Sequence, residues 1–278
     1  MNTKMNRRAM LRRLGAAGAA GAAGAAGAAS LPLALRAAED PAGGDPLNSM
    51  QWPGMRQKYL GDAPMRFTNE VIVTGPAFAD DAMSVPMLID ARALAHVGGG
   101  IERIDVVSDR NPIREVLSFE PLLALPMLAF RFRMEQASPV RAMVKTRNGQ
   151  WHVGSAWVQA AGGGCTVPGA TRADGSWSRT LNQVQAKFFS NVLAGSQRLR
   201  LRIMHPMDTG LVAGIPAFYV ENLQLVDDAG RVWWRLALHE PVSENPLLTF
   251  ELPQRPGSPL HLTGRDNNGN PISAEVAA

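Results

Sequence analysis

The sequence predicts an all-β protein built from two immunoglobulin-like β-sandwich domains that are joined by a glycine-rich arm. Apolar residues recur at every second position in many short stretches, as they do along one face of a β-strand. Turn-forming sequences such as Asp109-Arg110-Asn111-Pro112 and Arg147-Asn148-Gly149 separate these stretches. Strands separated by turns favour antiparallel sandwiches, because a parallel sheet needs helical crossovers between its strands.

Residues 1–38 have the composition of a cleaved export signal and are set aside from the fold. A basic start that contains Arg7-Arg8 leads into an Ala/Gly stretch over 14–35, and the small residues Ala37 and Ala38 suit a signal peptidase. Alanine and glycine give this stretch little hydrophobicity, which favours export over a permanent anchor. Arg8-Ala9-Met10-Leu11 follows the twin-arginine (Tat) pattern. We therefore expect a periplasmic protein, exported by the Tat pathway, with no membrane attachment after cleavage.

The net positive charge of +4 for the whole chain comes from this leader. Without the leader, 22 Lys and Arg face 24 Asp and Glu, so the remainder is close to neutral and slightly acidic. A nucleic-acid-binding protein would need a basic patch or stripe, so this class of partner is excluded. The six basic residues of the leader are Lys4, Arg7, Arg8, Arg12, Arg13 and Arg36.

Residues 39–65 are rich in Pro, Gly and Asp and are expected to form an approach segment that Trp52 and Tyr59 pack onto the first domain. The first domain is expected over residues 66–161, with little helix apart from one turn near 91–96. Its predicted strands carry the alternating residues Val71 and Val73; Val85, Met87 and Ile89; Ile104 and Val106; Leu128, Phe130, Phe132 and Met134; Val140, Ala142 and Val144; and Trp151, Val153 and Trp157.

Alternation stops at Ala160, and residues 162–180 are expected to form the arm and linker between the domains. The second domain is expected over residues 181–278, with hairpin turns at 227–230 and 266–269. Its predicted strands carry Val184, Ala186 and Phe188; Leu199, Leu201 and Ile203; the run 220–226; Val232, Trp234, Leu236 and Leu238; Leu248, Phe250 and Leu252; and Leu260 and Leu262.

Cys165 is the strongest candidate for chemistry, because it is the only cysteine of the chain and follows Gly162, Gly163 and Gly164. Three glycines make a narrow, flexible arm, and four residues extended from Ala161 reach about 13 Å. An exposed Cys165 could be presented to another protein's active site. In the alternative, the segment is a plain linker, or the thiol folds back into an apolar gap as a small hydrophobe. A lowered thiol pKa cannot be inferred, since the nearest cation in sequence is Arg172.

The histidines provide two weaker candidates. Met204 and Met207 flank His205 and would suit Cu(I), but a strand end followed by a turn explains the same residues without a metal. A Cys–His–acid enzyme that pairs Cys165 with His205 or His239 is disfavoured, because a catalytic nucleophile needs a rigid setting. Signatures of common hydrolases, zinc proteases and nucleotide-binding proteins are missing from the sequence.

Several motifs together resemble a known pair of families. Gly163-Gly164-Cys165 resembles the swinging-arm motif of SoxY, and 82–87 resembles a SoxY strand. The stretch Arg202-Ile203-Met204-His205-Pro206-Met207-Asp208-Thr209-Gly210-Leu211 is similar to a strand and turn of SoxZ, and 218–221, 245–250 and 266–269 follow in SoxZ-like order. In SoxY the cysteine lies in Gly-Gly-Cys-Gly-Gly at the free end of the chain. Here Thr166 and Val167 follow it, so the arm is tethered at both ends.

The resemblance implies a fused SoxY–SoxZ carrier of the type found beside quinoprotein dehydrogenases. Thiosulfate-derived intermediates of sulfur oxidation would stay covalently attached to Cys165, with no other cofactor and no turnover chemistry of the carrier itself. Partner enzymes, among them a c-type cytochrome, would act on the cargo, and a quinoprotein dehydrogenase system is a further expected partner. Two alternative hypotheses remain: an accessory or metal-binding protein of such a dehydrogenase, and a purely structural interaction module.

Overall fold

The computed structural model describes residues 40–190, 196–254 and 256–277. The export signal predicted over residues 1–38 lies outside the described residues and stays a prediction. The described chain is mostly β-strand and is arranged in two sheets, which confirms the all-β prediction. None of its helices is long and apolar enough to cross a membrane.

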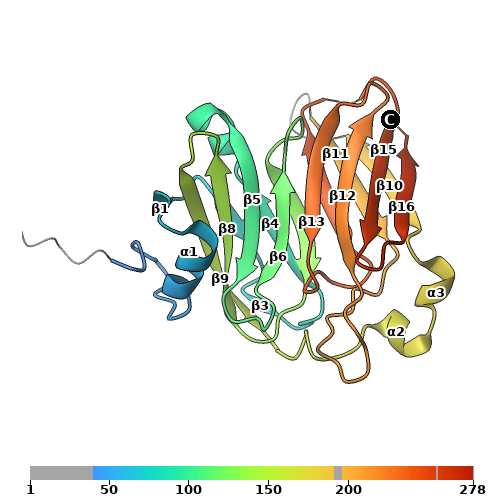
Figure 1. The fold of residues 1–278 in the computed structure, drawn as a ribbon, viewed down its shortest axis with the longest axis horizontal. Helices are drawn as coiled ribbons and strands as arrows, with labels where there is room; N and C mark the ends of the chain where they lie inside the picture. Colours follow the sequence, from blue (N-terminus) through green and yellow to red (C-terminus); the bar gives the residue numbers. More distant parts are fainter. Residues whose placement is uncertain (1–39, 191–195, 255, 278) are drawn as a thin grey trace, which may run out of the picture. The chain divides into compact units, whose positions relative to one another are not determined.

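The larger sheet contains strands from both ends of the chain (Figure 1). In spatial order it runs β1 (Met65–Phe67), β9 (Trp151–Ala160), β8 (Ser138–Thr146), β5 (Ile101–Ser108), β6 (Glu115–Glu120), β13 (Val232–Leu238), β12 (Val220–Asp227), β15 (Leu260–Asp266) and β16 (Pro271–Val276), while β3 (Phe78–Ala79) also pairs with β9. The smaller sheet runs β10 (Val184–Ser190), β11 (Gln197–Ile203), β14 (Leu247–Leu252), β7 (Met127–Phe132), β4 (Val85–Asp90) and β2 (Ile72–Thr74).

Both sheets continue across the boundary that the sequence predicts between two domains. In the larger sheet β6 pairs with β13, where Phe119 lies opposite Leu236. In the smaller sheet β7 pairs with β14, where Leu128 lies opposite Phe250. An unpaired strand edge presents a row of free backbone donors and acceptors, and each half uses its edge strands to satisfy those of the other. The two halves therefore form one continuous two-sheet sandwich.

The apolar core between the sheets is also shared by the two halves. The Trp234 indole stacks on the Phe250 ring at 4.2 Å between centroids, and Phe119 from the first half packs on the same ring at 5.7 Å. All three side chains are almost completely buried. Because the core has no gap at the predicted domain boundary, the halves stabilise each other by burial of apolar surface as well as by backbone hydrogen bonds.

The segment before the first strand folds back onto the larger sheet through helix α1 (Trp52–Leu60). Trp52 is fully buried in a second, smaller apolar cluster with Met143 and Trp151, and Tyr59 packs partly buried against it. The predicted packing of both aromatic residues is thereby confirmed. The buried Arg141 guanidinium ties this segment down, since it donates to both Asp45 and Asp109.

The predicted strands of both halves are present, and a 3₁₀ turn (Arg92–Leu94) lies where one helical turn was expected. The sequence reasoning missed β6, β16 and the short β1 and β3, together with helix α1. It also missed the short helices α2 (Ala170–Asp174) and α3 (Trp177–Thr180), which lie inside the expected linker. These elements are short or have weak alternation, so pattern alone did not reveal them.

Candidate functional site

Cys165 lies five residues after β9 and is buried, with 1% of its surface exposed. The expected presentation of this thiol to solvent on a flexible arm is therefore not what the structure shows. Its place corresponds to the alternative in which the segment folds back into the protein. The physical reason is a set of backbone and side-chain contacts that sequence reasoning did not anticipate.

The glycines of the arm are fixed by backbone hydrogen bonds to the chain after β7. Gly163 N–H donates to the Glu135 carbonyl at 3.0 Å, and Gly164 N–H donates to the Met134 carbonyl at 3.0 Å. A Cβ atom at Gly164 would lie 2.1 Å from the carbonyl oxygen of Ala82, which no side chain tolerates. The glycine at this position therefore permits close docking of the arm in addition to any flexibility that it confers.

Cys165 itself is held from both halves of the protein. Its N–H donates to Glu135 Oε2 at 3.1 Å, and its Sγ lies 3.7 Å from the Arg133 carbonyl oxygen. From the second half, Thr209 Oγ1 donates to the Cys165 carbonyl at 2.7 Å. We call Arg133, Glu135, Thr209 and the docked glycines 163–164 the thiol cage.

Arg133 is the buried centre of this cage, with 1% of its surface exposed. Its guanidinium donates to the carbonyls of Val167 on the arm and of Pro206 and Met207 in the second half. Burial lowers the pKa of the guanidinium, and its Nε has no hydrogen-bond partner among the described residues. One side chain of the first half thus joins the arm to the loop that follows β11.

The electrostatics of the cage keep the thiol protonated. The pKa of Cys165 is raised to about 12, mainly by burial and also by the Glu135 carboxylate, while Arg133 opposes both with a smaller effect. Since the thiolate is the reactive form of cysteine, Cys165 is unreactive while it is docked. Chemistry at this sulfur requires the arm to leave the cage.

His205, the second candidate, has a structural place beside the cage. It is 1% exposed, its Nδ1 accepts the Met207 N–H at 3.1 Å, and its Nε2 lies 3.7 Å from Asp266. Burial lowers the pKa of His205 to about 4, although Asp266 favours the charged form. The neutral ring thereby orders the loop that carries Thr209. Neither His205 nor His239 is hydrogen bonded to Cys165, and the described residues contain no group of three or more His, Cys, Asp or Glu placed to hold a metal.

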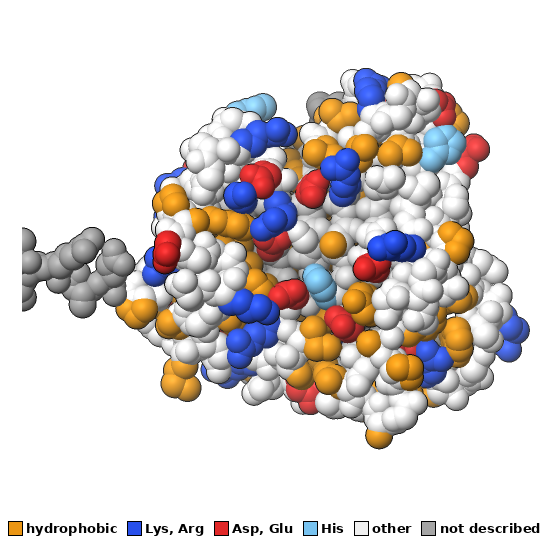
Figure 2. Space-filling view, in the orientation of Figure 1, with side chains coloured by type: hydrophobic (Ala, Val, Ile, Leu, Met, Phe, Trp, Pro, Cys, Tyr) orange, Lys and Arg blue, Asp and Glu red, His pale blue; other side chains and the backbone are white. Residues whose placement is uncertain are grey.

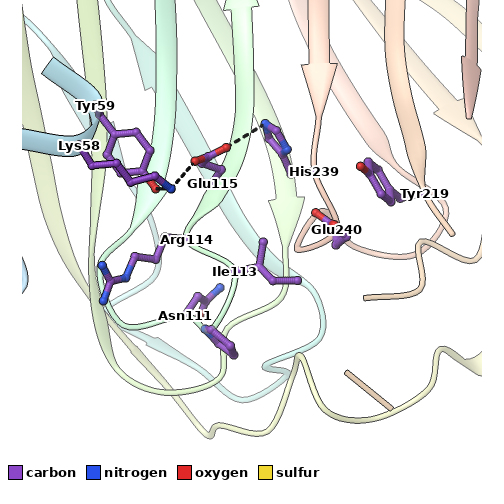
Figure 3. Close-up of a pocket in the computed structure, with 10 residues that line it drawn as sticks. Lys58, Tyr59, Asn111, Ile113, Arg114, Glu115, Tyr219, His239 and Glu240 are labelled. Atoms are coloured by element: carbon purple, nitrogen blue, oxygen red, sulfur yellow. Dashed lines mark hydrogen bonds and ion pairs between the residues drawn. The ribbon is translucent and has the colours of Figure 1, made fainter. Parts of the chain in front are cut away.

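A cavity of about 600 Å³ lies where β6 begins and β13 ends (Figure 3). On one wall Lys58 donates to Glu115 at 2.9 Å, and Glu115 also faces His239 at 3.8 Å. Figure 2 shows charged side chains of both signs gathered over the middle of this face. Asn111 joins this cavity to the cage, because its amide donates to the Arg133 carbonyl and accepts the Glu135 N–H.

The cage contains residues that sequence reasoning did not select. Thr209 lies within the SoxZ-like motif, but no role was expected for it. No sequence pattern or motif pointed to Arg133 or Glu135. Their sequence distance from Cys165 is about 30 residues for Glu135 and 44 for Thr209. Only the fold brings them together.

Comparison with known proteins matches both halves of the chain to families. Residues 56–165 match the family described as sulfur oxidation protein SoxY, and residues 191–277 match the family described as sulphur oxidation protein SoxZ. The first match ends on Cys165 itself. Both matches are to sulfur oxidation proteins, and they define the class of this all-β sandwich. The chain carries a SoxY domain followed by a SoxZ domain, the arrangement of a fusion of the two.

Among the many solved structures that match the chain, one aligns with less than half of it. It is that of the sulfur carrier protein SoxY from Chlorobium limicola f thiosulfatophilum, with 16% sequence identity and a TM-score of 0.33. The alignment covers 40% of this chain and 96% of that chain. No curated protein sequence matches the chain.

Proposed function

We propose that this protein is a periplasmic carrier in which Cys165 holds thiosulfate-derived sulfur covalently while separate enzymes act on it. The observation that carries the proposal is the position of Cys165. It is the only cysteine in the chain, and it ends the SoxY match at a segment held mainly by hydrogen bonds. The carrier needs no turnover chemistry of its own.

The docked arm supports a reversible carrier rather than a permanent structural cysteine. The arm is held by a hydrogen bond from Cys165 to Glu135, one from Thr209, two at the preceding glycines and one from Arg133 to Val167. Hydrogen bonds of this kind contribute about 1 kcal/mol each, so local release of the arm costs several kcal/mol and does not require global unfolding. A partner that binds the released arm could supply this free energy.

Loading converts the thiol into a thiosulfonate. The Cys165 thiol and thiosulfate form an S–S bond and give Cys–S–S–SO₃⁻, one proton and two electrons. An acceptor for two electrons is therefore required, and a c-type cytochrome partner would take them one at a time, at two haems or in two encounters. Release by a thiol or an enzyme proceeds through attack on the same S–S bond. A quinoprotein dehydrogenase system is a second expected partner, and export by the Tat pathway would place the carrier with both.

Intact-mass spectrometry of the protein purified from its native periplasm without reductant tests this proposal. We expect an added sulfur atom or thiosulfate-sized group that maps to Cys165 and is removed by reductant. Treatment of the unloaded protein with tetrathionate should produce the thiosulfonate and release thiosulfate, which supplies a positive control without an added oxidant. Cys165→Ser should carry neither adduct. A thiol that stays unmodified in both experiments would exclude the carrier function.

A further inference from the structure

A second feature lies beside the docked arm on the smaller sheet. It is a cleft of about 340 Å³ lined by Arg131 of β7, Arg202 of β11, Ser84, and the 243–247 stretch that leads into β14. We call it the arginine cleft. Met83, which precedes Ser84, accepts a hydrogen bond from Ser243 Oγ at 2.7 Å, so the wall of the cleft is joined to the strand segment next to the arm.

The sheet register places both arginines on one face. Arg202 lies opposite Leu247, and Thr249 lies opposite Ala129. Side chains alternate along a strand and cross-strand partners share a face, so Arg131 is on the same face as Ala129, and hence as Leu247 and Arg202. Two strand spacings of about 4.8 Å separate the backbones of the arginines, a distance that two long side chains can close around one small group.

Neither arginine side chain has a carboxylate partner in the part of the chain that the structure describes. The Arg202 side chain makes no hydrogen bond or ion pair with any described residue, and the Arg131 side chain donates only to Ser84 Oγ, at 3.4 Å. Both side chains are exposed. Elsewhere on the same strand, Arg198 is paired with Glu251 at 3.0 Å, so lack of a partner is not a general feature of β11.

Glu244 is the one carboxylate in the lining, and it is directed to the arm. Its Oε1 accepts the Thr171 N–H at 2.9 Å and the Asn245 amide at 3.5 Å. The cleft therefore presents two guanidinium groups with hydroxyl groups from Ser84 and Ser243. Guanidinium forks bind carboxylate, sulfate and phosphate oxygens in paired hydrogen bonds and suit tetrahedral oxyanions.

We propose that the arginine cleft binds a sulfur oxyanion through Arg131 and Arg202. The oxyanion can be free in solution or can be the terminal sulfonate of the cargo on Cys165. The second source rests on the proposed carrier function, whereas binding of the free anion does not. Thr171, which contacts Glu244 at the rim, is six residues from Cys165, and an extended chain of that length spans about 20 Å. A cargo on the released arm is thus within reach of the cleft.

Calorimetric titration of the full chain with sodium thiosulfate and sodium sulfate tests the free-anion site, with chloride at equal ionic strength as the reference. The Cys165→Ser variant serves as the host because it permits no covalent chemistry. We expect saturable binding that weakens about tenfold in Arg131→Gln and in Arg202→Gln, and is lost in the double variant. Arg114→Gln, which removes an exposed arginine that lines a cavity on the larger sheet, is the matched control and should bind as the host does.

Absence of saturable binding would overturn the proposal, and so would equal affinity in the three single variants Arg131→Gln, Arg202→Gln and Arg114→Gln. A second titration, on the protein that retains Cys165, separates the two sources of the anion. When tetrathionate has placed a thiosulfonate on Cys165, we expect sulfate affinity to fall several-fold and to recover after reduction. Unchanged sulfate affinity in the loaded protein would overturn the cargo as occupant. A protein that binds sulfate yet never accepts an adduct would exclude the carrier function and leave the cleft in place.

Discussion

The thiol cage and the arginine cleft are built from neighbouring segments of the structure, but they place their ionisable side chains in opposite environments. In the cage, a nucleophile is 1% exposed and burial keeps it protonated. In the cleft, Arg131 and Arg202 are exposed and have no carboxylate partner among the described residues. The contrast teaches that recognition of an anion needs no rearrangement of this protein, whereas reaction at its sulfur does. Variants that change one region and not the other test this separation.

The largest expected effect comes from Gly164→Ala. The new Cβ would lie 2.1 Å from the Ala82 carbonyl oxygen, so the arm cannot dock. A shift of the Cys165 pKa from about 12 to the ordinary value of 9.0 raises the thiolate fraction about a thousandfold at neutral pH. We expect the rate of maleimide modification to rise by up to that factor, while sulfate binding in the cleft stays the same.

Gly54→Ala is the matched control, because a Cβ at this position in α1 meets no atom within 4 Å. It should leave the modification rate unchanged. If Gly164→Ala reacted as slowly as the wild type, close docking of the arm would not be what protects the thiol.

The next effect is a pH dependence that originates at His205. Its pKa is lowered to about 4 in the folded state and is near 6.5 in the unfolded chain, so the unfolded state binds the extra proton first. The contribution of His205 to the free energy of unfolding is fully present above pH 6.5 and decreases as the pH falls toward 4. We expect a loss on the order of 2–3 kcal/mol over this range in urea titrations.

His205→Gln should remove this part of the pH dependence, and the difference between wild type and variant isolates it from other titrating groups. The Met207 N–H loses its Nδ1 acceptor when the ring is protonated, so thiol accessibility should rise over the same range. His261→Gln, at a half-exposed histidine, is the control. Parallel curves for wild type and His205→Gln would contradict the assignment.

The smallest effect is expected from Thr209→Val, which removes the 2.7 Å hydrogen bond to the Cys165 carbonyl. A buried carbonyl left without its donor costs about 1–3 kcal/mol, so local opening of the cage should become about tenfold more frequent. The measurement is again the maleimide rate at neutral pH. Thr263→Val, on β15 of the larger sheet, is the matched control. An unaltered rate in Thr209→Val would show that the second half does not help to hold the thiol.

Local pattern was sufficient to predict much of this fold. Alternation at Val85, Met87 and Ile89, or at Leu199, Leu201 and Ile203, reports one buried face of a strand, and these residues do lie in the core. The pairing of β6 with β13 could not be predicted in the same way, because no local pattern specifies which edge a strand meets. The sequence therefore indicated two sandwiches but not that their sheets are continuous.

The candidate site divides along the same line. Cys165 was selected from the sequence as the distinctive residue of a SoxY-like segment, and its burial was considered only as the alternative to an exposed thiol. The glycines gave a signal of flexibility, and in the structure Gly164 also allows close contact with Ala82. Arg133 and Glu135 act on Cys165 from about 30 residues away, and such a contact becomes visible only when the strands are assembled. Attachment of sulfur to Cys165 stays a prediction.

The strand pairings of β6 with β13 and of β7 with β14 change what the covalent fusion contributes to the protein. A proteolytic cut between α2 and α3 would leave these ladders and the shared aromatic core intact, so the fragments would stay associated. The peptide link is then not what holds the halves together. It fixes their ratio at one to one and replaces a bimolecular encounter by an intramolecular one at high effective concentration. Each thiol is thereby made together with the Thr209 that covers it.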